Sequence, residues 1–396
     1  MPWEQARTVA RNSAGRPLAK IHRGLPEALG HALAEPLTAR TDLPPFDTSA
    51  MDGWAVAGPG PWRLRGGGVL AGEQPAPLLP GTAVPLATGA MLPPGATAVL
   101  RREHGESETP DDVPDDVLHH RSPGPLAPGR DIRPRGQECR TGEPLLPAGT
   151  TVTPAVLGLA AAAGYDRLAV HRRPTVELLL LGDELLDHGV PREGRVRDAL
   201  GPLLAPWLHR GGAEVIGARR VADELGPLCA AMRRSPADVV VTTGSTAAGP
   251  VDFLHTALAE TGARLLVDSV AVRPGHPMLL AELPPAADDR PRLLVGLPGN
   301  PLAAVAGAVT LATPLLRSLG GHRDRTVRRV AAAALPGHPG DTRLLPVRLA
   351  EGAAEPIAFD GPAMLRGLAL ADGLAVVPPG GLAAGATTEV LAVPGP

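Results

Sequence analysis

Residues 175–181 read TVELLLL, an apolar run with the length of a buried strand. A similar run, ADVVVTTG, spans 237–244, and helix-like segments cover 198–212 and 301–320. Strands that alternate with helices in this way indicate βαβ units and a mostly parallel sheet. The sequence therefore predicts a doubly wound α/β domain over residues 174–324. In such a domain, ligands bind beyond the carboxyl ends of the strands.

The regions on either side of this domain have a different pattern. Residues 48–135 contain short strands separated by Gly and Pro turns, which predicts a small β-rich domain. Residues 325–396 return to short strands and are expected to form a C-terminal β-barrel-like domain. Residues 1–47 and 136–173 are assigned to an N-terminal and linker domain. Within it, residues 16–40 are expected to form an amphipathic helix followed by a strand.

The composition excludes several classes of protein. The chain has 396 residues, a net charge of −3 and no basic arm. Nucleic acid is therefore an unexpected partner, because phosphate binding needs clustered Lys and Arg. Cys139 and Cys229 are the only cysteines, which makes a disulfide framework unexpected. The longest uninterrupted apolar stretch considered, VLGLAAAAG, is too short to cross a bilayer. We expect a soluble, cytoplasmic protein without a membrane partner.

Two loops of the α/β domain carry acidic or glycine-rich residues. Asp183 and Glu184 follow the first predicted strand, where adjacent carboxylates can bind Mg²⁺ or can cap a helix. The glycine-rich loop between Gly244 and Gly249 leads to Asp252. Its backbone N–H groups can approach an anion, although a plain tight turn is an equally good interpretation.

Two further loops of the same domain offer polar side chains. Asn300 can cap a helix that begins at Pro301, and it can also contact a ligand. The stretch VRPGHP places Arg273 and His276 beside Pro277, where they could meet an oxyanion, although a single loop His is more often merely exposed. No Ser/His/Asp triad and no His/Cys zinc pattern is evident.

Nine stretches, taken in order, resemble one family and cover almost the whole chain. It is the molybdopterin molybdotransferase family, which includes bacterial MoeA and the E domain of gephyrin. The matching stretches are LPPFDTSAMDGWAV, ATGAMLPPGATAVL, IRPRGQE, LPAGTTVTPAVLGLAAAAG, RRPTVELLLLGDEL, DVVVTTGSTAAGPVDF, VAVRPGHPM, VGLPGNPLAAV and MLRGLALADGLAVVP.

The resemblance implies an architecture and a reaction. The subunit would be elongated, with a molybdopterin-binding α/β domain, a β-rich cleft domain and a C-terminal β domain. Two subunits would form a head-to-tail homodimer, with each active site shared between them. Molybdate would be inserted into adenylylated molybdopterin, AMP would leave, and Mg²⁺ would assist. An adenylyltransferase or a recipient molybdoenzyme is a further expected partner.

The resemblance also assigns site residues. Asp52 would lie at the rim of the cleft, held in place by the packing of Phe46, Met51 and Trp54, although a solvated Asp-Gly hairpin turn is the simpler interpretation. The catalytic positions are Asp52, Thr88, Glu138, Glu184 and Asp198. The metal positions are Asp183, Glu184 and Asp252. The substrate-binding positions are Gly244, Gly249, Asp252, Arg273, His276, Pro277, Asn300 and Arg343.

The chain departs from the family pattern mainly within the α/β site. Leu181 replaces a Thr, Ala199 and Leu200 replace Ser and Asn, His276 replaces a Lys, and Pro362 stands near a family Ser. These losses raise a second hypothesis, in which a catalytically weakened paralogue binds molybdopterin or a partner protein. A molybdopterin adenylyltransferase is a third possibility, but the extra β domains argue against it.

Overall fold

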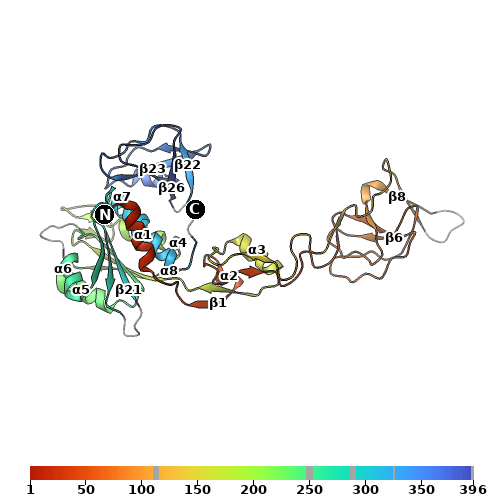
Figure 1. The fold of residues 1–396 in the computed structure, drawn as a ribbon, viewed down its shortest axis with the longest axis horizontal. Coiled ribbons are helices and arrows are strands. Elements are labelled where there is room, and N and C mark those ends of the chain that lie inside the picture. The colour runs from red at the N-terminus through yellow and green to blue at the C-terminus, as the bar shows by residue number, and fades with distance from the viewer. Residues whose placement is uncertain (110–115, 247–252, 286–290, 324–325, 394–396) are drawn as a thin grey trace.

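The structure is a computed structural model of an elongated subunit (Figure 1). An α/β unit and a C-terminal β unit occupy one end, a linker lies in the middle, and a small β unit forms the other end. Both chain termini lie at the α/β end. The structure describes residues 1–109, 116–246, 253–285, 291–323 and 326–393.

The α/β unit is built on a six-stranded sheet, and the prediction of a mostly parallel sheet is confirmed. The strand order is β16 (Glu214–Val221), β13 (Thr175–Leu181), β17 (Val239–Thr243), β21 (Arg292–Leu297), β20 (Leu279–Leu283) and β18 (Arg264–Asp268). The first four strands in this order and the last run in the same direction, and only β20, between them, is antiparallel to its neighbours. The covering helices include α4 (Leu200–Arg210), α5 (Leu225–Arg234) and α6 (Leu254–Thr261).

One long apolar helix fills the core of this unit. It comprises α7 (Pro301–Gly307), a π-helical segment (Ala308–Ala312) and α8 (Thr313–Leu319). Its mean hydropathy of 1.5 and its length would suit a membrane span, but 83% of it is buried inside the described part of the molecule. Such burial is expected of the core helix of a soluble domain.

The N-terminal residues correct one prediction. Residues 16–40 do not form the expected amphipathic helix; they contain β1 (Lys20–Gly24), the single turn α2 (Leu25–Ala28) and β2 (Leu37–Thr38). Pro26 and Pro36 interrupt the helical pattern, because proline lacks an N–H and restricts the residue before it. The N-terminal helix is α1 (Trp3–Ser13), and its Trp3 Nε1 donates to the buried Thr310 Oγ1 at 2.9 Å.

The linker is a narrow unit with its own core of buried side chains. Strand β1 pairs with β12 (Arg167–His171), and β2 pairs with β11 (Pro144–Leu146). Helix α3 (Pro154–Ala162) covers them. Beyond the linker, β3 (Thr48–Ser49) and β10 (Ile132–Arg133) pair where the chain enters and leaves the small β unit.

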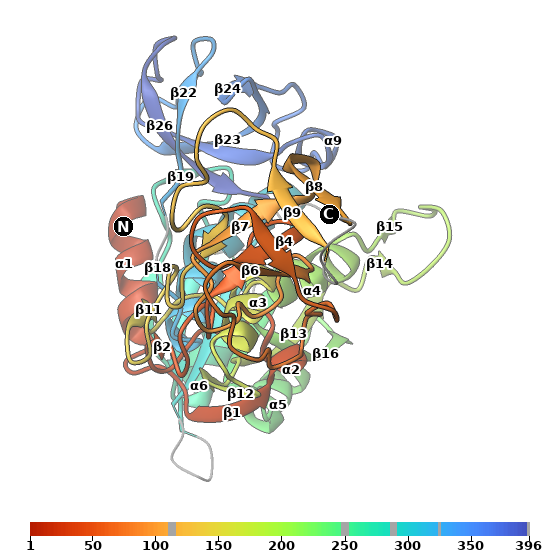
Figure 2. The same ribbon diagram turned by 90° about the vertical axis from the view of Figure 1, so that its right-hand side faces the viewer.

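The small β unit is a curved six-stranded sheet, which faces the viewer in Figure 2. Its strand order is β7 (Ala98–Arg101), β4 (Gly53–Val56), β6 (Thr82–Leu86), β5 (Trp62–Leu64), β9 (Val117–His120) and β8 (Gly105–Glu108). A β-rich unit was predicted from the regular Gly and Pro turns in this part of the sequence.

The C-terminal unit is a closed barrel, which confirms the predicted β-barrel-like domain. Its strands are β23 (Thr342–Ala350), β24 (Ala353–Pro356), β22 (Arg328–Ala331), β26 (Thr387–Ala392) and β25 (Gly373–Val377). Strand β25 pairs back onto β23 and closes the ring. Strand β19 (Val272–Arg273) joins β23 and ties the barrel to the α/β unit. The predicted domain boundaries themselves stay predictions.

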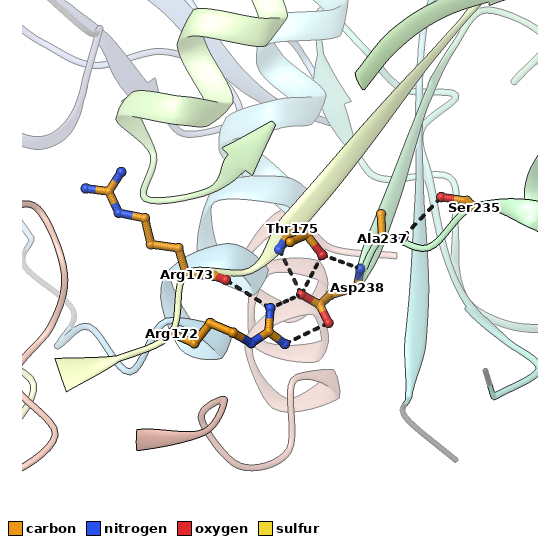
Figure 3. Close-up of polar contacts among 6 residues, drawn as sticks. All are labelled: Arg172, Arg173, Thr175, Ser235, Ala237 and Asp238. Carbon is orange, nitrogen blue, oxygen red and sulfur yellow. Dashed lines mark hydrogen bonds and ion pairs between the residues drawn. The ribbon is translucent and has the colours of Figure 1, made fainter. Parts of the chain in front are cut away.

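A partly buried ion pair joins the linker to the α/β sheet (Figure 3). Arg172 donates through Nη1 and Nη2 to the two carboxylate oxygens of Asp238, at 2.8 and 3.0 Å. The backbone N–H and the hydroxyl of Thr175 both donate to the same carboxylate, each at 2.8 Å. Asp238 is 4% exposed. Burial alone would raise its pKa, but the hydrogen bonds from Arg172 and Thr175 outweigh burial and lower the pKa.

A histidine at the same junction is expected to make stability depend on pH. His322 shares a 2.9 Å hydrogen bond with Thr151 of the linker. Burial, and then the charges of Arg317 and Arg173, lower the pKa of His322 from 6.5 to about 4. The unfolded chain therefore binds more protons than the folded chain between these pH values. Between pH 7 and 4.5, this one group is expected to remove about 2 kcal/mol from the free energy of unfolding.

Urea unfolding of the wild type and of His322→Gln, measured over this pH range, tests the expectation. Other titrating groups contribute equally to both proteins, so the difference between the two pH profiles isolates His322. Identical profiles would contradict the prediction.

Candidate active site

The small β unit holds Asp52 in a fixed position. Asp52 precedes β4, and Thr88 follows β6. Thr88 donates to Asp52 Oδ1 through its backbone N–H at 2.7 Å and through its hydroxyl at 2.9 Å. These two hydrogen bonds lower the pKa of Asp52, so the exposed carboxylate remains ionised at neutral pH. The structure thus brings together two predicted site residues that are 36 positions apart.

A close backbone approach and a local hydrogen bond shape this turn. A Cβ atom on Gly53 would lie 2.0 Å from the carbonyl oxygen of Leu100, so only glycine fits. The Ser49 hydroxyl donates to the Met51 carbonyl at 2.5 Å. Phe46 is 36% exposed, and its packing against the turn stays a prediction.

Asp52 lies on the wall of a hollow of about 510 Å³, which Trp54 and Arg102 also line. Glu138 is another predicted catalytic residue; its side chain is exposed, and no hydrogen bond or ion pair joins it to Asp52 in the described residues. Its backbone N–H donates to Leu43 at 2.8 Å in the linker. The catalytic role of Glu138 stays a prediction.

In the α/β unit, the predicted loops lie at the carboxyl edge of the sheet. Gly182, Asp183 and Glu184 follow β13, and Gly244 follows β17. Gly244 has a φ of +84° and donates to the carbonyl of Leu297 at 2.8 Å, which joins the ends of β17 and β21. The left-handed backbone at this position favours glycine.

Asp223 joins this acidic loop, although it was not among the predicted site residues. Its Oδ2 accepts the backbone N–H of Asp183 at 3.1 Å. Burial raises the pKa of Asp223, and the carboxylates of Asp183 and Glu184 act in the same direction. Asp223 follows β16 closely, much as Asp183 follows β13. An acidic residue two positions after a predicted strand, as at Asp183, was therefore the sequence signal that could have identified Asp223.

Asp198 caps a helix in the structure. Its Oδ1 accepts the backbone N–H groups of Leu200 and Gly201, at 2.9 and 3.1 Å, at the start of α4. This capping uses one carboxylate oxygen and is compatible with a ligand contact through the other. A catalytic role for Asp198 stays a prediction.

Asn300 was expected to cap the helix that begins at Pro301, and the structure does not show this cap. Its side chain makes no capping hydrogen bond at α7. The carbonyl of Pro362, from the C-terminal barrel, accepts the N–H groups of Leu302 and Ala303 at 2.9 and 3.2 Å. The amide of Asn300 is therefore left at the edge of a pocket between the α/β unit and the barrel.

This pocket gathers most of the predicted oxyanion-binding residues. Arg273 on β19 pairs in register with Arg343 on β23, so two guanidinium groups come from adjacent strands of different units. His276 donates through Nδ1 to the Val270 carbonyl at 3.1 Å, which leaves Nε2 for other partners. The cavity has a volume of about 450 Å³, and its walls include Arg273, His276, Pro277, Asn300, His338, Arg343, Asp360 and Pro362.

The predicted positions Gly249 and Asp252 lie outside the described residues. Within the part of the chain that the structure describes, no group of three or more His, Cys, Asp or Glu side chains is arranged to hold a metal ion. A cation at Asp183 and Glu184 would therefore need further oxygen ligands.

One subunit does not bring the two halves of the predicted site together. Asp52 and Thr88 belong to the small β unit, at the opposite end of the subunit from the α/β unit and its pocket (Figure 1). The linker separates these two ends.

Fold and site define a multidomain α/β-plus-β protein with an Arg-lined pocket between its α/β unit and a barrel. Three family models match the chain: the MoeA N-terminal region (domains I and II) over residues 1–164, a probable molybdopterin binding domain over 177–318, and the MoeA C-terminal region (domain IV) over 328–393. The chain belongs to the MoeA family.

Individual relatives agree with this assignment. A molybdopterin molybdenumtransferase from Synechococcus elongatus is 34% identical, over 76% of this chain and 75% of its own length. One from Bacillus subtilis is 30% identical, over 93% and 89%. A crystal structure described as a molybdopterin biosynthesis MoeA protein from Pyrococcus horikoshii has a TM-score of 0.74 at 27% identity, and covers 100% of this chain and 99% of its own.

Proposed function

We propose that this chain is a molybdopterin molybdotransferase of molybdenum cofactor biosynthesis, which inserts molybdate into adenylylated molybdopterin and releases AMP. The family assignment spans nearly the whole chain, and the relatives carry this activity in their names. The pairing of Arg273 with Arg343 is the observation that carries the proposal. Two guanidinium groups beside one cavity suit a tetrahedral dianion, because Arg binds oxyanions through charge-assisted hydrogen bonds.

The acidic loop of the α/β unit supplies the complementary chemistry. Asp183 and Glu184 would hold Mg²⁺ together with substrate phosphates, because Mg²⁺ typically takes one or two carboxylates and further oxygen ligands. When bound, Mg²⁺ would neutralise charge on the phosphoanhydride. Asp52 is a carboxylate at neutral pH and Thr88 fixes its position through two hydrogen bonds, so it can orient a polar reactant or stabilise positive charge.

The active site is shared between two subunits of a homodimer. Support comes from the shape of the subunit, in which Asp52 and Glu184 belong to units at opposite ends (Figure 1). A head-to-tail pair of subunits would bring the small β unit of each chain to the α/β unit of the other. Each dimer would then contain two sites, each made from both chains.

Mixing two inactive variants tests the shared site. Asp52→Asn and Glu184→Gln are each expected to be inactive alone. Unfolding and refolding the two together gives dimers of which half are mixed, and each mixed dimer has one intact site. AMP release should therefore recover to about a quarter of the wild-type rate, a consequence of two-fold symmetry. No recovery would mean that each site is built within one chain.

The decisive assay for the function supplies adenylylated molybdopterin and Mg²⁺, with or without molybdate, and measures AMP. Molybdate-dependent AMP release is the expected result. Tight molybdopterin binding without AMP release would overturn the proposed activity and leave the weakened paralogue, which the relatives do not favour.

The protein would work in the cytoplasm, as suits a chain whose long apolar helix is a core element. An adenylyltransferase that supplies the adenylylated substrate, or a molybdoenzyme that receives the product, would be its partner. The two candidate partners are expected because one would make the substrate and the other would use the product.

A further inference from the structure

The two pocket arginines are paired with carboxylates in different ways. Arg273 donates through Nε to Asp341 at 2.8 Å, and its two terminal nitrogens make no hydrogen bond within the described residues. Arg343 donates through Nη2 to Asp360 at 2.6 Å and through Nη1 to the Pro336 carbonyl at 3.2 Å. An oxyanion bound in bidentate fashion needs two N–H groups of one guanidinium. Arg273 can offer its terminal pair freely, whereas each terminal nitrogen of Arg343 already donates one of its two N–H groups, to Pro336 or to the charged Asp360.

Asp360 belongs to a short segment, residues 359–364, which we call the strap. Phe359 has a φ of +68°, an unfavourable conformation for an aromatic residue. The guanidinium of Arg366 lies 4.4 Å from its ring centroid. Farther along the strap, the Pro362 carbonyl accepts two N–H groups from the start of α7. The strap therefore places Asp360 against Arg343 at the expense of a strained backbone, and such strain is often found at switch regions.

We propose that Asp360 is a built-in competitor, which occupies Arg343 and must be displaced before a tetrahedral oxyanion can bind both pocket arginines. This inference rests on the proposed function, because molybdate is the oxyanion in question. Asp341 has a different role: it orients Arg273 through Nε and leaves the terminal nitrogens toward the ligand. A ligand must break the Asp360–Arg343 contact to reach Arg343. Only an anion that binds both arginines regains that free energy, so weakly bound monoanions are disfavoured.

The two aspartates provide a matched pair of variants. Asp360→Asn and Asp341→Asn make the same chemical change beside the two pocket arginines. Molybdate binding, measured by equilibrium dialysis of the full-length protein, should become about tenfold tighter in Asp360→Asn, since a charge-assisted hydrogen bond no longer competes. In Asp341→Asn, the amide oxygen can still accept from Arg273 Nε, so Arg273 keeps its position and binding should change much less than in Asp360→Asn.

Unchanged or weaker binding in Asp360→Asn would overturn the proposal. Tighter binding in both variants would indicate a general charge effect and would overturn it as well. Asp360→Ser carries the same expectation if the amide perturbs the strap, and Asp360→Glu should stay near the wild type. AMP release by the wild type is measured separately. If the wild type releases AMP normally and Asp360→Asn binds molybdate no more tightly than the wild type, the competition by Asp360 is refuted. The proposed function is then unaffected.

Discussion

Asp238→Ala is expected to lower the free energy of unfolding by about 3 kcal/mol, the lower end of the cost of removing one partner from a buried ion pair, because Arg172 is partly exposed. The substitution leaves Arg172 without its carboxylate, and it also removes the acceptor for both donors of Thr175. Since Arg172 belongs to the linker side and Asp238 to the α/β sheet, the loss falls on the junction between the two units.

Urea unfolding of the variant checks this expectation, with Glu106→Ala as the comparison. Glu106 also pairs with an arginine, Arg121, but both side chains are more than half exposed. An exposed pair of this kind contributes about 0–1 kcal/mol. An Asp238→Ala protein no less stable than Glu106→Ala would contradict the structural role of the network.

Asp52→Asn is expected to reduce the rate of AMP release about 100-fold or more, the usual scale for losing one preorganised electrostatic group at a reacting centre. The amide has the shape of the carboxylate and can still accept from Thr88 through its oxygen, so the turn should keep its geometry while it loses the charge. Thr88→Val removes only the hydroxyl donor and should have a smaller effect.

Turnover at saturating molybdate measures the Asp52 effect. Glu103→Gln is a suitable control, because Glu103 is an exposed carboxylate of the same unit and lies 3.8 Å from Arg101. It should turn over like the wild type. Near-normal turnover by Asp52→Asn would remove Asp52 from the catalytic machinery.

Much of the fold could be predicted from the sequence, because buried parallel strands leave a plain signal. Residues 175–181 match β13 residue for residue, since both faces of that strand are covered. The N-terminal helix was missed because its buried face consists of Trp3 and two alanines among charged residues. The incorrect helix over residues 16–40 had a suitable apolar spacing, but prolines outweigh that spacing.

The sequence could suggest candidate site residues, but it could not show which of them contact one another. Asp52 and Thr88 were both identified, yet nothing local shows that one binds the other. Asp360 was not identified, because its significance depends on Arg343 in a separate strand. Such contacts arise from tertiary packing of segments that share no sequence pattern.

The small β unit is inserted between β3 and β10, which pair with each other, and this has an evolutionary consequence. Ser49 lies opposite Ile132, so more than eighty residues are inserted between two points that touch. Such an insert can be exchanged between homologues as a cassette without redesigning the rest of the chain. The sequence of the insert that carries Asp52 and the sequence around the arginine pocket at the other end of the subunit can therefore change independently.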